Sequence, residues 1–127
     1  MLTDQRAYAT LPTADLERLR RFYEDTLGFT AHKATPGGIY YHAGDGSLFA
    51  ITRSAGKPSG AHTQMAFQVP DIRRQVDELL ARGVVFEQYD LPTIKTVDSV
   101  ARMPAGQAAW FKDPDGNTIG MFQFDEP

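Results

Sequence analysis

The pattern of apolar and polar positions occurs twice along this chain of 127 residues. A strand-like run over residues 6–11 precedes Asp15, after which apolar side chains recur at helical spacing: Leu16, Leu19, Tyr23 and Leu27. A second such run over residues 63–69 precedes Asp71, after which the same spacing returns: Ile72, Val76, Leu79 and Leu80. About fifty-six residues separate the two aspartates. A repeat of this size predicts two similar modules whose halves enclose one cavity.

Both predicted helices have recognisable ends. Asp15 and Asp71 can each accept hydrogen bonds from the free N–H groups of a first helical turn, as N-cap residues do, with Thr13 as the alternative cap of the first helix. Gly28 and Gly83 follow the last apolar positions and suit the left-handed conformation in which many helices end. The helices are therefore expected between each aspartate and the glycine that follows it.

Further strands are expected after each helix. In the first module they are predicted over residues 30–35, 39–43 and 48–52, with glycine-containing turns between them. In the second module they are predicted over residues 84–89, 108–112 and 118–124. The sequence from Asp113 to Asn117, DPDGN, is a strong turn signal before the last strand. Residues 90–106 are predicted to form a long loop with one short strand at 100–103, and long loops in compact domains are often functional.

The element order is therefore βαβββ, twice, which predicts an α+β fold. We expect a single domain over residues 1–127, because this length suits one hydrophobic core. Module one covers about residues 6–53 and module two about residues 62–124. Residues 54–61, rich in Gly, Ser and Pro, form a linker that is too short to separate independent domains.

Composition and charge exclude several classes of protein. A net charge of −3 and scattered Lys and Arg residues argue against a nucleic-acid binder. No apolar run approaches the ~18 residues that a membrane span needs, and the N-terminus lacks a signal-peptide pattern, so a cytoplasmic protein with no membrane partner is expected. With no cysteine, the chain cannot form disulfides or zinc–thiolate sites.

Two segments carry a family resemblance. The predicted first helix reads DLERLRRFYEDTLGF, and WFKDPDGNTIGMFQ lies near the end of the chain. In their order and spacing, and with the repeated βαβββ pattern, they resemble the glyoxalase / bleomycin-resistance / dioxygenase family, also called the vicinal oxygen chelate family. The resemblance covers roughly residues 8–123. It implies two modules whose strands curl into an open barrel of mixed sheet around a ligand cavity, with the helices outside. It also implies a homodimer with the cavity near the subunit interface.

The resemblance further implies four positions for metal ligands. In metal-dependent members, His, Gln or Glu ligands lie on the first and last strands of each module. The matching positions here hold Tyr8, Ala50, Gln64 and Gly120. Alanine and glycine have no side-chain donor, and a catalytic zinc-like centre needs three protein ligands. No metal ion and no other cofactor is therefore expected.

Strand alternation predicts what lines the cavity instead. Successive strand side chains point to opposite faces. One face is almost wholly apolar and is expected to pack under the helices; it includes Leu11, Phe49, Ile51, Ile119 and Met121. The other face, with Trp110 as an additional aromatic wall, gives the predicted ligand-binding residues: Tyr8, Thr10, Ala50, Thr52, His62, Gln64, Gln68, Trp110, Gly120 and Phe122. The alternative for the three aromatic residues among them is simple core packing.

Three functional interpretations stay open at this point. The preferred one is a metal-free protein that binds a small organic ligand, aromatic or drug-like, as the resemblance to the bleomycin-resistance branch implies. The second is an enzyme of the same family: a lyase, isomerase or dioxygenase with displaced metal ligands, or a metal-free catalyst using Tyr8, His62 or Gln64. The third is an interaction protein that uses exposed aromatic residues: Tyr40, Tyr41 and Tyr89. The sequence names neither the ligand nor the reaction.

Overall fold

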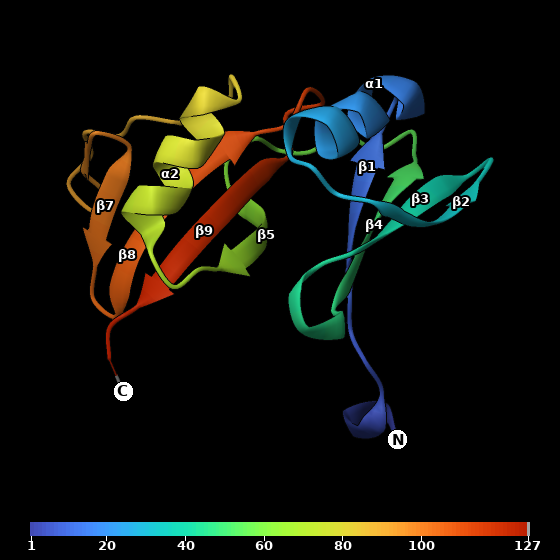
Figure 1. Cartoon of the computed structure of the whole chain (residues 1–127), viewed down its shortest axis with the longest axis horizontal. Helices are drawn as coiled ribbons and strands as arrows, with labels where there is room; N and C mark the ends of the chain where they lie inside the picture. Colours follow the sequence, from blue (N-terminus) through green and yellow to red (C-terminus); the bar gives the residue numbers. More distant parts are fainter. Residues whose placement is uncertain (127) are drawn as a thin grey trace. The chain divides into compact units, whose positions relative to one another are not determined.

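The computed structural model describes residues 1–126 and contains two compact units. The first unit is Met1–Lys57, and the second begins at Pro58. Each unit has one mixed sheet with a helix packed on one face (Figure 1). The predicted α+β class is therefore confirmed; the first unit has the predicted βαβββ order, and the second has four described strands after its helix instead of three.

In the first unit, four described strands pair in the order β1-β4-β3-β2. Their bounds are β1 Ala9–Thr13, β2 Ala31–Thr35, β3 Gly38–His42 and β4 Leu48–Arg53. β1 runs parallel to β4, and the other neighbours are antiparallel. β1 is therefore an edge strand whose one strand neighbour within residues 1–126 is β4.

Helix α1, Leu16–Arg21, covers one face of this sheet. Leu19 and Tyr23 are fully buried, and the Tyr23 ring lies 5.6 Å from that of Phe49 and 6.1 Å from that of Tyr41. Phe49 and Tyr41 are partners across β3 and β4, so they share the face that α1 covers. Tyr41, predicted as an exposed interface residue, is instead part of this core.

The first predicted helix changes its winding before its end. The α-helix stops at Arg21, and Phe22–Thr26 forms a π-helical turn. The Leu27 N–H donates to the Phe22 carbonyl at 3.0 Å, five residues back. Gly28 then has φ +87°, the left-handed conformation predicted for it.

In the second unit, five strands of the described chain pair in the order β5-β9-β8-β7-β6. Their bounds are β5 Thr63–Gln68, β6 Thr96–Val97, β7 Val100–Met103, β8 Gly106–Lys112 and β9 Thr118–Phe124. β5 runs parallel to β9, as β1 does to β4 in the first unit. Helix α2, Ile72–Ala81, covers one face. The core of this unit is formed by Ile72, Val76, Ala109, Phe111, Ile119 and Met121.

The prediction of a strand over residues 84–89 is wrong. Within it, Phe86 forms an isolated bridge to Phe111, and the Glu87 N–H donates to the Trp110 carbonyl at 2.8 Å. β7 occupies the rest of the same β8 edge, between Gly106 and Ala108. Because two segments share this edge, neither runs along its whole length. The predicted strand at 100–103 is confirmed as β7, and the short β6 was not predicted.

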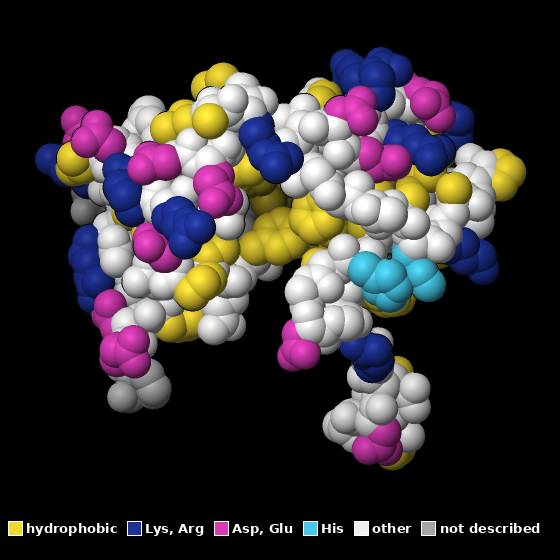
Figure 2. Space-filling view, viewed as in Figure 1, with side chains coloured by type: hydrophobic (Ala, Val, Ile, Leu, Met, Phe, Trp, Pro, Cys, Tyr) yellow, Lys and Arg dark blue, Asp and Glu magenta, His cyan; other side chains and the backbone are white. Residues whose placement is uncertain are grey.

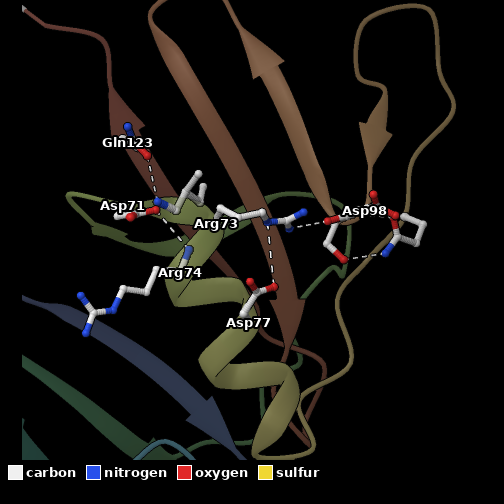
Figure 3. Close-up of polar contacts among 9 residues, drawn as sticks. Asp71, Arg73, Arg74, Asp77, Asp98 and Gln123 are labelled. Atoms are coloured by element: carbon white, nitrogen blue, oxygen red, sulfur yellow. Dashed lines mark hydrogen bonds and ion pairs between the residues drawn. The ribbon is translucent and has the colours of Figure 1, made fainter.

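Two side chains accept hydrogen bonds from the first turn of α2, one from the N-cap residue and one from β9 (Figure 3). The Arg74 N–H donates to the Asp71 carboxylate at 3.1 Å, and the Ile72 N–H donates to Gln123 Oε1, on β9, at 2.8 Å. Asp15 accepts from the Arg18 N–H in the same way at α1. The two predicted caps are therefore confirmed.

Replacing Asp71 by alanine is expected to lower the free energy of unfolding by about 1 kcal/mol, because the first turn of α2 loses an acceptor. Urea denaturation measures the change. Asp71→Asn is the matched control, since its amide oxygen can still accept from the Arg74 N–H and most of the stability should remain. Equal losses in the two variants would contradict the capping role.

Candidate functional site

The first sheet has an open face, which is the face away from α1. Thr10 and Tyr40 are both strand partners of Ala50, and Pro12 is the partner of Thr52, so these side chains share one side of the sheet. Tyr8, just before β1, is half exposed, and its ring lies edge-on to Tyr40 at 6.2 Å. The structure thus brings together the four predicted residues of this module: Tyr8, Thr10, Ala50 and Thr52.

The second sheet has an equivalent open face, on the side away from α2. Gly120 is the strand partner of both Ala66 and Trp110, and Phe122 is the partner of both Gln68 and Ala108. Four predicted residues of this module therefore share one side of the sheet: Gln68, Trp110, Gly120 and Phe122. Each open face is by itself a candidate binding surface.

A β-bulge interrupts the regular strand pairing near His62 and Gln64. Thr63 pairs with Thr118 and Met65 with Ile119, so Gln64 is the additional residue of a β-bulge. His62 lies before β5, exposed, with its Nδ1 2.6 Å from Ser59 Oγ. Gln64 Oε1 is buried and has no hydrogen-bond partner in the structure. Because the bulge interrupts the regular register before Met65, the placement of His62 and Gln64 on the face of Ala66 and Gln68 stays a prediction.

Thr63 contacts Trp110 and lies beside Gly120. Its Oγ1 accepts a hydrogen bond from Trp110 Nε1 at 3.1 Å, which satisfies the indole N–H. A β-carbon at Gly120 would lie 3.1 Å from Thr63 Cγ2 and 3.4 Å from Trp110 Cδ1. Gly120 thus leaves space that the threonine and the indole use. Residue type and spacing gave no signal for Thr63, since a bulge depends on pairing with a distant strand.

Trp110 is the centre of the second open face. It is partly exposed, and its ring lies edge-on to Tyr89 at 5.5 Å. The Phe122 ring lies 4.6 Å from that of Phe124, which shares its side of β9. The face therefore presents aromatic surface with a few hydroxyl and amide groups.

The four positions that correspond to the family's metal ligands do not suit a metal ion. Ala50 and Gly120 supply no donor atom, and a side chain added at Gly120 would crowd Thr63 and Trp110. Neutral amide and phenol groups are weak ligands for divalent ions without carboxylates or imidazoles beside them. Within residues 1–126, no group of three or more His, Cys, Asp or Glu side chains is arranged to hold a metal.

The ionisable side chains whose pKa values are shifted, described next, lie away from both open faces. Burial, followed by its hydrogen bond to Glu24 at 3.0 Å, raises the pKa of Tyr41 on the face that α1 covers. Arg20 lies 2.7 Å from the same Glu24 carboxylate. The hydrogen bond from Arg102 lowers the pKa of the exposed Asp125 carboxyl. The arrangement on the open faces favours binding through aromatic contact and neutral hydrogen bonds.

A charged groove of about 690 Å³ lies elsewhere on the second unit, beside the N-terminus of α2. Arg73 reaches across it to the Asp98 carbonyl in the β6–β7 turn and also approaches Asp77 (Figure 3). The other two cations that line it, Lys95 and Arg102, pair with Asp90 and Asp125. The groove includes none of the predicted site residues.

None of the helices within residues 1–126 has the length and apolar character needed to cross a bilayer.

Comparison with known proteins gives one family and one fold. The family model of the Glyoxalase/Bleomycin resistance protein/Dioxygenase superfamily matches residues 5–121. No curated protein matches the chain.

Three solved structures illustrate the fold. A bleomycin resistance determinant encoded on the transposon Tn5 is 20% identical, with 96% of this chain and 99% of that chain covered and a TM-score of 0.73. A bleomycin-binding protein complexed with bleomycin is 20% identical, with 95% and 99% covered and a TM-score of 0.73. TnmS3, an antibiotic-binding protein from Streptomyces sp. CB03234, is 24% identical, with 95% and 96% covered and a TM-score of 0.68.

Proposed function

This chain belongs to the Glyoxalase/Bleomycin resistance protein/Dioxygenase superfamily, and from that membership we propose that it binds a small, planar aromatic molecule without a metal ion. The ring of the bound molecule packs against Trp110 on the open face of the second sheet. Similar folds occur in a bleomycin-binding protein and in an antibiotic-binding protein, which supports a small organic ligand of this kind.

The observation that carries the proposal is the composition of the second open face. Trp110 is held by its hydrogen bond to Thr63 and by edge-on contact with Tyr89, so the ring is ordered while part of it stays accessible. An indole fixed in this way loses little conformational freedom on binding, and flat aromatic ligands stack on it favourably. Gly120 beside it leaves the strand without a side chain that would compete for that surface.

The absence of donor side chains at Ala50 and Gly120 supports the metal-free part of the proposal. Elemental analysis of the dialysed protein tests it. A stoichiometric metal ion that resists dialysis would contradict it and would favour an enzyme of the family. The homodimer and the position of its interface stay predictions from the resemblance, and the cytoplasmic location stays a prediction from the composition and the N-terminal sequence.

Ligand binding should be visible through Trp110 itself, because it is the one tryptophan of the chain. A library of aromatic natural products is screened by thermal shift, and each hit is titrated while the tryptophan emission is followed. We expect a hit to raise the melting temperature and to change the emission. Trp110→Ala should weaken binding at least tenfold by calorimetry, since stacking and area burial are both lost.

Two further variants make the test specific. Trp110→Phe keeps an aromatic ring and should retain most of the affinity. Leu80→Ala removes an exposed apolar side chain of α2, the helix on the other face of the sheet, and should leave affinity unchanged. A Trp110→Ala variant that binds as tightly as the wild type would overturn the assignment of this surface.

A further inference from the structure

His32 and His42 lie ring against ring on the neighbouring strands β2 and β3. Their ring centroids are 4.0 Å apart, with an angle of 53° between the planes. Both side chains are exposed, and Figure 2 shows histidine side chains gathered in one continuous patch. No residue of the proposed ligand-binding set takes part in this contact.

A β-bulge in β2 lies at the pair. Ala31 pairs with Tyr41 and Lys33 with Tyr40, so His32 is the additional residue between two regular positions. In a regular ladder, His32 would lie opposite Tyr40 and Thr30 opposite His42. Ala31 and Tyr41 are strand partners, so alternation gives His32 and His42, each the next residue along its strand, the same side of the sheet. The contact is thus a property of the strand pairing and not of an adjacent pair in the sequence.

The ring nitrogens of both side chains are available. Within residues 1–126, neither His32 nor His42 has a hydrogen-bond or ion-pair partner in the protein. The third histidine differs, because Nδ1 of His62 already contacts Ser59 Oγ at 2.6 Å. Two exposed imidazoles with free nitrogens and mutual contact can turn toward one bound ion without disturbing the core.

We propose that His32 and His42 together chelate one divalent transition-metal ion, and that Cu²⁺ is the ion they bind most tightly. Imidazole suits copper, nickel and zinc, and copper binds most strongly in the ordinary order of these ions. Two nitrogens that each lie ~2.0–2.1 Å from a metal are about 3 Å apart, a separation that rings in contact reach by small rotations. Water fills the remaining positions. The site is separate from the four family positions, which lack the donors for a metal centre.

Calorimetric titration of the whole chain with Cu²⁺, in a buffer that does not coordinate copper, tests the proposal. We expect one equivalent to bind to the histidine pair. His32→Ala and His42→Ala should each weaken that binding at least tenfold, because a single imidazole cannot chelate. Electron paramagnetic resonance of the wild-type complex should show two imidazole nitrogens on copper.

His62→Ala is the matched control, since it removes the one other histidine of the chain and should leave the affinity unchanged. Copper bound by the N-terminal amine contributes equally to every variant and cancels in the comparison. All three side chains are exposed, so equal melting temperatures confirm that the variants are folded. Wild-type affinity in His32→Ala or His42→Ala, or an equal loss in His62→Ala, would overturn the proposal. Elemental analysis that tests the four family positions is done on the double variant His32→Ala/His42→Ala, in which this histidine pair cannot contribute bound metal.

Discussion

Gly106→Ala should lower the free energy of unfolding by about 3 kcal/mol or more, because the added methyl group has no space. Gly106 is the buried first residue of β8. A β-carbon there would lie 2.1 Å from the Gln123 carbonyl oxygen and 2.7 Å from Phe122 Cε1, both on β9. Relief requires β8 and β9 to separate, which would also displace the open face that carries Phe122. Urea denaturation measures the loss.

Gly44→Ala is the control, because a β-carbon at Gly44 meets nothing within 4 Å. It should change stability by no more than a few tenths of a kcal/mol. The first unit has an equivalent of Gly106 in Gly38, the first residue of β3, where a β-carbon would lie 2.6 Å from the Ile51 carbonyl oxygen. Equal urea midpoints for Gly106→Ala and Gly44→Ala would show that the β8–β9 contact relaxes without cost.

Asp113→Ala is expected to cost about 3 kcal/mol, because one buried carboxylate organises the whole β8–β9 turn. Asp113 Oδ1 accepts from the backbone N–H groups of Asp115 and Asn117, each at 3.0 Å. Its Oδ2 accepts from Asn117 Nδ2 at 2.7 Å, and Asn117 is fully buried. Alanine removes these acceptors and leaves the donors of Asn117 in a place that water does not reach. Thermal and urea denaturation measure the loss.

Asp113→Asn separates charge and geometry from the loss of the side chain. Its amide oxygen can still accept from the two backbone N–H groups, while the contact with the Asn117 amide becomes donor against donor. We expect a stability between those of the wild type and Asp113→Ala. Since the turn joins the strands of Trp110 and Gly120, Asp113→Ala should also weaken ligand binding. A loss below 1 kcal/mol would mean that the turn holds its shape through its backbone alone.

Local signals predicted the parts of the fold that local contacts determine. Asp15 and Asp71 cap the helices because a cap needs an acceptor within three residues of the free N–H group. β9 has the predicted bounds, because its strand-like sequence begins directly after the turn signal DPDGN and ends with the module. The helix-covered faces follow from the same alternation, as Phe49 and Ile119 show by their burial.

The bulges could not be predicted in this way. At Gln64 and at His32, one additional residue on a strand faces a partner that is distant in the sequence, and the choice depends on packing across the sheet. One bulge lies next to Thr63, which contacts Trp110, and the other lies at His32, which contacts His42. The sharing of the β8 edge between residues 86–87 and β7 likewise depends on tertiary pairing.

The parallel pairs at the sheet edges bear on how this chain acquires its structure. In each unit the earliest strand pairs with the latest, β1 with β4 and β5 with β9, and has no other strand neighbour within the described chain. Contacts between distant parts of a sequence form slowly, because the intervening segment must be ordered first. A nascent chain that has not yet reached Thr118 therefore carries β5 with unpaired backbone groups. Co-translational assembly of the second unit must wait for its last seven-residue strand.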